Sequence, residues 1–251
     1  MSFNVLALIL FSALITACIS GIFGMAGGLI FMGVIVSFLG VAEAMVVHGA
    51  VQSVSNAYRA FLLRDAIRWD VFFKIALGSF PAILLLVLAS YVPTKGVLFC
   101  ALGLLPVLLW LPKRFVHLDI QTPMHAVFCG FCTTGLNLVA GVAGPALDMF
   151  FVRSDMPRHQ VVATKAITMF ASHVMKIFYF GIPLLKAHGL SSLPPSWFFL
   201  AAIPFIMTGT FIGTRILKRM SDIGFRKYTR WLVSVIGVVY LWRGLSLLGW
   251  L

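Results

Sequence analysis

Two polar stripes carry the side chains of this chain that are best suited to chemistry. The stripe within residues 43–63 contains His48, Gln52, Ser55, Asn56 and Arg59. The stripe within residues 158–181 contains Lys165, Thr168, Ser172, His173 and Lys176. Their spacing, mostly three or four residues, places each set on one face of a helix. A shift of 117 residues aligns the stripes and indicates an internal repeat, matching His48 with Lys165, Asn56 with His173, and Arg59 with Lys176.

The basic members of the stripes predict a site for an anion. Arg59, Lys165 and Lys176 fall inside apolar segments, where a charge costs roughly 2.5 kcal/mol or more unless it faces a cavity or a partner. Asp148 is the only acid placed well inside; we expect it to pair with Lys165, with proton uptake as the alternative. Two interpretations stay open for Arg59 and Lys176, because each lies about one turn from a segment end. They either meet the anion at opposite mouths of a pathway or snorkel to the nearer interface.

The uncharged members of the stripes predict additional hydrogen-bond donors. Gln52, Asn56 and Thr168 would converge on the same ligand as the basic side chains. His48 and His173 would hydrogen-bond the ligand or shuttle protons, unless they serve only in packing. The spacing of the other histidines indicates no metal site, and no cofactor is predicted.

Two glycine clusters interrupt the apolar chain at corresponding places. Gly24-Met25-Ala26-Gly27-Gly28 and Gly141-Val142-Ala143-Gly144-Pro145 align at the same shift of 117 residues. Glycine weakens a helix and leaves its backbone uncovered, so broken helices persist in membranes only where they line a cavity or are buried in protein. Pro145 suits the first turn of a new helix. We therefore expect two half-helix N-termini whose N–H groups can bind a small anion; the alternative is close helix packing.

The elements that must position these residues are membrane-spanning helices. The chain of 251 residues is 61% hydrophobic and 10% charged, with a mean hydropathy of +1.04. This composition predicts an all-α polytopic membrane protein in contact with the lipid bilayer. The formal charge of +12 does not indicate nucleic-acid binding, because the basic residues lie mainly at the ends of apolar segments.

The order of the apolar segments predicts two inverted repeats. The segments are 4–21, 26–39, 43–63, 70–91, 96–111, 123–140, 145–152, 158–181, 196–217 and 228–250. Placing the basic-rich junctions in the cytoplasm gives equivalent segments of the two halves opposite directions, with both termini outside. Residues 1–118 and 119–251 would each form a broken or re-entrant helical hairpin followed by three transmembrane helices, within a single transmembrane domain. Inverted repeats with discontinuous helices are typical of secondary transporters.

A Cys-x-x-Cys pair offers a different function. Cys129 and Cys132 lie two to three turns inside the segment that begins near Pro123. Redox chemistry by this pair is the alternative to small-residue packing beside the second glycine cluster.

The chain resembles the sulfite exporter TauE/SafE family of membrane transporters. The resemblance lies in the two glycine clusters and in the stretch from Ala50 through Tyr58 to Trp69-Asp70, and it spans both halves. It implies transport of a small sulfur-containing or carboxylate anion, such as sulfite or a sulfonate, across the bacterial inner membrane. Leu29 and Asp148 depart from the usual family pattern, in which a glycine or proline and an apolar residue are common.

We therefore predict a non-enzymatic secondary transporter that works by alternating access, with export of sulfite or an organosulfonate as the specific expectation. A membrane thiol oxidoreductase using Cys129 and Cys132 and a passive anion channel are the alternatives. The predicted partners are the small anionic substrate and the bilayer; a homo-oligomer is left open. The predicted site comprises Gly24, Gly27, Gly28, His48, Gln52, Asn56, Arg59, Gly141, Gly144, Pro145, Asp148, Lys165, Thr168, His173 and Lys176.

Overall fold

A computed structural model describes residues 2–23, 26–111, 118–151, 154–217, 219 and 222–251, and over these residues the protein is helical without strands. The α-helices are α1 (Phe3–Phe23), α2 (Ala26–Phe38), α3 (Val41–Leu62), α4 (Trp69–Leu88), α5 (Lys95–Leu104), α6 (Pro123–Ala140), α7 (Gly144–Phe151), α8 (Arg158–His188), α9 (Ser196–Leu217) and α10 (Asp222–Leu247). Short 3₁₀ segments are η1 (Arg64–Ala66), η2 (Leu105–Trp110) and η4 (Leu190–Ser192). The all-helical prediction is confirmed.

The longest helix differs from its predicted segment. The apolar segment was expected to end at residue 181, whereas α8 continues to His188 and includes Pro183. A proline removes one helical hydrogen bond, a loss that helices in membranes tolerate. The phenol of Tyr179 lies 2.9 and 2.7 Å from the backbone oxygens of Leu86 and Tyr91, which share its one hydrogen, and so joins this helix to the end of α4.

Among the described residues, five helices are long and apolar enough to cross a membrane: α1, α4, α6, α8 and α9. Helix α3 has 22 residues, but its polar stripe makes it less apolar. Helices α2 and α7, with 13 and 8 residues, are too short to cross alone. On α4, large apolar side chains at helical spacing are exposed, as expected for a lipid-facing surface: Phe73, Leu77, Phe80, Leu84 and Leu88. The chain is therefore a multi-pass membrane protein.

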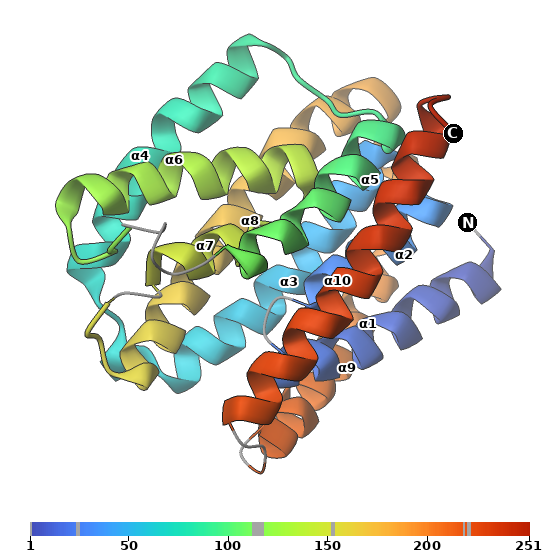
Figure 1. Ribbon diagram of the computed structural model, residues 1–251. Helices are drawn as coiled ribbons and strands as arrows, with labels where there is room; N and C mark the ends of the chain where they lie inside the picture. Colours follow the sequence, from blue (N-terminus) through green and yellow to red (C-terminus); the bar gives the residue numbers. More distant parts are fainter. Residues whose placement is uncertain (1, 24–25, 112–117, 152–153, 218, 220–221) are drawn as a thin grey trace.

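The helices pack mainly in pairs drawn from opposite halves of the chain. Figure 1 shows α4 beside α6, α1 beside α9, and α10 crossing close to α5. Helices α3 and α8, which carry the two polar stripes, form another such pair. The stripes therefore face each other inside the bundle.

Glycines allow α4 and α6 to approach closely. A Cβ atom at Gly78 would overlap the backbone of Val127, and one at Gly130 would overlap the carbonyl oxygen of Ile75 and lie 2.9 Å from the nitrogen of Ser79. Because these obstacles are backbone atoms, they cannot move aside as a flexible side chain would. The close packing of α4 and α6 therefore requires glycine.

We expect Gly130→Ala to lower the free energy of unfolding by about 1–3 kcal/mol, the usual cost of overpacking. Gly135, one and a half turns along the same helix, is the matched control, because a Cβ there would meet nothing within 4 Å. Gly135→Ala should leave the thermal midpoint in detergent unchanged or raise it slightly, because alanine favours helix. Equal midpoints for the two variants would contradict the packing argument.

Candidate functional site

The second glycine cluster forms a break between two helices, as predicted. Gly141 follows α6 with φ +74°, a left-handed conformation that favours glycine, and α7 begins at Gly144 with Pro145 in its first turn. A Cβ atom on Gly141 would lie 2.9 Å from the Cε of Met32 and 3.1 Å from its sulfur. The left-handed backbone conformation therefore favours glycine at this break, and the end of the Met32 side chain would have to shift to admit a larger residue.

The first cluster joins α1 to α2, and its glycines serve different purposes. Gly24 lies outside the described residues. A Cβ atom on Gly27 would overlap the backbone of α1 at Thr16, so close packing accounts for this glycine. Gly28 lies under the side-chain amide of Gln52, whose Nε2 would be 2.6 Å from a Cβ at this position. The packing interpretation thus holds for Gly27, and Gly28 faces the polar stripe of α3.

Lys176 lies at the centre of the bundle. Its side chain is fully buried, and its Nζ lies 2.8 Å from Nδ1 of His48, 2.8 Å from the carbonyl oxygen of Gly141 and 3.3 Å from Oδ1 of Asn137. Of the two interpretations left open for Lys176, snorkelling to an interface is ruled out, because the side chain is fully buried and α8 extends three turns beyond it. The three N–H groups of the ammonium instead have three uncharged acceptors.

His48 links Lys176 to the first break. Its Nε2 lies 3.0 Å from the carbonyl oxygen of Gly28. A carbonyl oxygen only accepts, so Nε2 carries the hydrogen, and Nδ1 of the neutral ring accepts from Lys176. The ring stacks on Phe31 and meets the ring of His173 edge-on, at centroid distances of 6.0 and 5.4 Å. One chain of hydrogen bonds therefore runs from Gly28 through His48 and Lys176 to Gly141, connecting the two breaks.

A second group of charged residues lies in a half-buried position. Lys165 and Asp148 form an ion pair, and their side chains are 30% and 31% exposed. The prediction that Asp148 pairs with Lys165 is thus confirmed. The guanidinium of Arg59 is half-buried and lies close enough to Lys165 for the two positive charges to interact. This group contains two cations and one carboxylate.

The remaining predicted side chains surround these two groups. The side-chain amide of Asn56 donates to the backbone oxygen of Gln52 in its own helix, over 2.9 Å. The hydroxyl of Thr168 and Nδ1 of His173 are buried and have no hydrogen-bond partner among the described residues. These two atoms remain available to a ligand.

Asn137 is a member of the buried group that was not predicted from the sequence. Its Oδ1 accepts from Lys176, and its Nδ2 donates to the hydroxyl of Ser172 over 2.7 Å. The signal was present, because an amide inside an apolar segment needs a polar partner in a membrane. Asn137 lies one turn before Gly141 and outside the two polar stripes, so the spacing of the stripes did not predict it.

The Cys-x-x-Cys pair lies in the contact between α4 and α6. Cys129 is buried in an apolar cluster with Val71 and Ile75, and Cys132 is half-buried beside it. Both cysteines are free thiols. Their surroundings are those of small packing residues in a helix contact.

One comparison with known proteins gives a match. The model of the family described as sulfite exporter TauE/SafE matches residues 9–240, which include both glycine clusters and both polar stripes. Comparisons with curated proteins and with solved structures give no match.

Proposed function

Because the chain belongs to the sulfite exporter TauE/SafE family, a family of membrane transporters of sulfur anions, we propose that it is a secondary transporter that moves sulfite or an organosulfonate out of the cell. The corresponding location is the bacterial inner membrane. The family is one of transporters rather than enzymes, which agrees with a non-catalytic role.

The observation that carries the proposal is the excess of buried positive charge at the helix breaks. Lys176 is fully buried, and its hydrogen-bond partners among the described residues are all uncharged. Arg59 lies near Lys165, and among the described residues the one acid that pairs with Lys165 is Asp148. Buried cations of this kind are costly unless they serve a ligand or a pathway, so the balance of charge favours an anion.

The pairing of helices supports two inverted repeats, residues 1–118 and 119–251. The two halves contain five α-helices each, α1–α5 and α6–α10. Exchanging each helix with its counterpart in the other half converts the pair α1 and α9 into the pair α6 and α4, and both pairs pack closely. The same exchange leaves the pairs α3 with α8 and α5 with α10 unchanged. Such invariance is expected for halves related by a two-fold axis in the membrane plane.

Individual contacts support the same relation between the halves. Adding 117 to the residue numbers of Phe31 and His48 gives Asp148 and Lys165. The first two residues stack their rings, and the second two form an ion pair, so both pairs are in contact. The same shift likewise converts the contact of His48 with Lys176 into the proximity of Lys165 to Arg59. The two groups of residues would thus be equivalent positions with different chemistry.

This difference suggests how alternating access would work. The group around His48 and Lys176 is fully buried, whereas the pair of Lys165 and Asp148 is about 30% exposed. With the predicted topology, the exposed group lies nearer the cytoplasm. We propose that rocking of one repeat against the other exposes one group while it buries the other.

The anion would bind between the two groups at the half-helix N-termini. Backbone N–H groups of Gly27, Gly28, Gly144 and the residues after Pro145 would donate to it. Gln52, Asn56, Thr168 and His173 would add neutral donors, and Lys165, Arg59 and Lys176 would supply the positive field.

Saturable flux of sulfite is the expected result for protein reconstituted into lipid vesicles. Uptake of radiolabelled sulfite should reach a plateau with concentration and should be inhibited by an organosulfonate such as sulfoacetate. In detergent, sulfite at about 100 times its Kd should stabilise the protein by about 2.7 kcal/mol. Flux that rises in proportion to concentration would indicate a channel, and the absence of both flux and stabilisation with any anion would overturn the proposal.

A further inference from the structure

The hydroxyl group of Tyr240, on α10, contacts the backbone of the half-helix α2. Its Oη lies 3.2 Å from the carbonyl oxygen of Leu29 and 3.3 Å from that of Ile30, and these two oxygens share its one hydrogen. Both carbonyls follow directly on Gly28, where the first glycine cluster ends. A side chain from the second half of the chain therefore holds the half-helix close to the first break.

The phenol occupies a slot that Gly33 leaves open. A Cβ atom at Gly33 would overlap the hydroxyl oxygen of Tyr240 and the ring carbon that carries it. On α5, the ring of Phe99 meets the tyrosine ring edge-on, with centroids 5.5 Å apart. The slot belongs to α2 alone of the two half-helices, because the shift of 117 residues places Phe150 of α7 at the position equivalent to Gly33. Packing of α2, α5 and α10 thus sets the position of the hydroxyl group.

Three consecutive carbonyl oxygens of α2 accept hydrogen bonds from side chains of other helices. Gly28 accepts from His48 of α3. Leu29 and Ile30 accept from Tyr240 of α10. Successive residues of an α-helix point about 100° apart around its axis, because one turn takes about 3.6 residues. Donors from two different helices therefore oppose rotation of α2 about its own axis, which apolar packing opposes less because it has no fixed direction.

The rotation of α2 decides where its N-terminal N–H groups point. The transported anion would accept hydrogen bonds from the backbone of Gly27 and Gly28, which lies within one turn of the carbonyls that Tyr240 holds. A binding group must stay within roughly 0.5 Å of its productive position, and this precision comes from supporting residues that do not touch the ligand. Tyr240 has the geometry of such a support.

We propose that Tyr240 is a positioning residue for the transported anion, because its hydroxyl group holds α2 at the angle at which Gly27 and Gly28 donate to the ligand. This inference rests on the proposed function and adds to it a residue that lies outside both polar stripes and both glycine clusters. Loss of the hydroxyl group leaves all the proposed ligand-binding groups in place but less well aligned. The affinity for the anion should therefore fall, while the steps that follow binding keep their rate.

Tyr240→Phe removes the hydroxyl group and keeps the ring against Phe99. For full-length protein in lipid vesicles, the KM for sulfite should rise about threefold to tenfold, the loss expected for one hydrogen bond, while maximal flux per folded protein stays within about twofold of wild type. The Kd for sodium sulfite, measured by calorimetry in detergent, should rise by the same factor. The backbone amides of residues 26–38 should exchange hydrogen faster, because α2 opens more readily.

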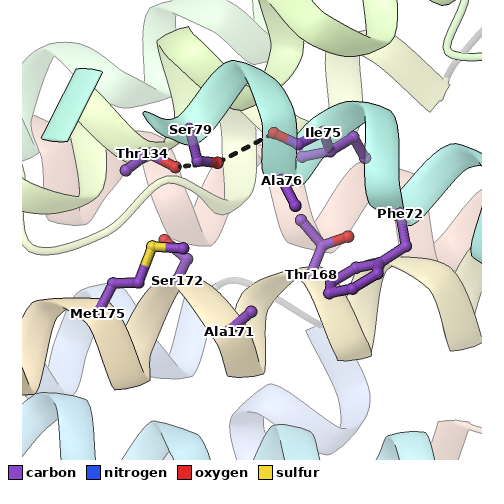
Figure 2. A pocket seen from close by; sticks show the side chains of 9 residues that line it. All are labelled: Phe72, Ile75, Ala76, Ser79, Thr134, Thr168, Ala171, Ser172 and Met175. Atoms are coloured by element: carbon purple, nitrogen blue, oxygen red, sulfur yellow. Dashed lines mark hydrogen bonds between the residues drawn. The ribbon is translucent and has the colours of Figure 1, made fainter. Parts of the chain in front are cut away.

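Two control variants separate this effect from a general loss of stability. Thr134→Val also removes a buried hydroxyl group that joins two helices, because Thr134 of α6 donates to Ser79 of α4 over 2.7 Å (Figure 2). Tyr228→Phe removes a phenol hydroxyl group from α10 at an exposed position. We expect Thr134→Val to lower the thermal midpoint and Tyr228→Phe to leave it unchanged. Both controls should transport sulfite with the wild-type KM.

The results distinguish this inference from the proposed function. Saturable sulfite flux in the wild type, with the same KM in Tyr240→Phe and Tyr228→Phe, would overturn the role of Tyr240 alone. An equal rise of the KM in Thr134→Val would also overturn it, because the effect would then follow from the loss of any buried hydroxyl bond. Wild-type protein that neither transports nor binds sulfite or sulfoacetate would overturn both. A higher KM in Tyr240→Phe alone, with faster exchange in α2, supports the assignment.

Discussion

Replacing Lys176 with Met is expected to lower sulfite flux roughly a hundredfold or more, while the free energy of unfolding should change by less than about 2 kcal/mol. Two effects of opposite sign act on stability. The buried acceptors on His48, Asn137 and Gly141 lose their donor, at about 1–3 kcal/mol each. Removing the buried ammonium also relieves a desolvation penalty of several kcal/mol.

The effect of the substitution on sulfite flux, unlike its effect on stability, is not offset by a second effect of opposite sign. Without Lys176 the two breaks lose the hydrogen-bonded link between Gly28 and Gly141, and the interior loses its most deeply buried positive charge. Flux into vesicles, normalised to folded protein, and thermal unfolding in detergent measure the two quantities separately. Lys186→Met is the matched control, because Lys186 lies exposed on the same helix. Flux within threefold of wild type in Lys176→Met would contradict the role assigned to this residue.

Replacing Lys165 with Met is the second substitution with a large expected effect. The variant leaves the carboxylate of Asp148 without its partner on the proposed anion pathway, so the anion meets a negative charge where it met a balanced pair. We expect flux to fall at least about tenfold, since loss of a charged hydrogen-bonding partner commonly costs about 1.5–3 kcal/mol. The ion pair is about 30% exposed, so its loss should cost stability less than about 1 kcal/mol.

Asp148→Asn separates charge from packing at the same place. In this variant Lys165 no longer has a competing carboxylate, so the KM for sulfite should fall severalfold. The double variant with Lys165→Met should recover part of the flux lost in the single variant, because the uncompensated carboxylate is gone. A double variant as inactive as Lys165→Met alone would instead show that the ammonium itself is needed.

The helices and their breaks could be predicted because their signals are local. Apolar runs and glycine clusters lie within a few residues of the features that they determine. Gly141 and Pro145 mark the second break in the sequence as clearly as in the structure. The pairing of Lys165 with Asp148 could also be predicted, since a buried cation needs a partner and only one acid lay well inside an apolar segment.

The surroundings of Lys176 could not be predicted in the same way. The apolar segment predicted from the sequence ends at residue 181, soon after Lys176, which made an interfacial position one of the two interpretations. Tertiary contacts carry the helix on to His188, with Tyr179 bonded to the end of α4. The partners Asn137 and Gly141 come from a different helix and from a backbone oxygen, and neither is encoded by spacing along α8.

The length of α8 has a consequence for the surrounding lipid. Its 31 residues span about 46 Å, whereas the hydrocarbon core of a bilayer is about 30 Å thick. The helix must therefore tilt or project beyond the acyl chains, and Tyr179 fixes it to α4, so that it cannot adjust its angle alone. A change in acyl-chain length would then act on α4 and α8 together and, through them, on the contact between these two helices inside the bundle. Bilayer thickness is thus coupled mechanically to the interior of this protein.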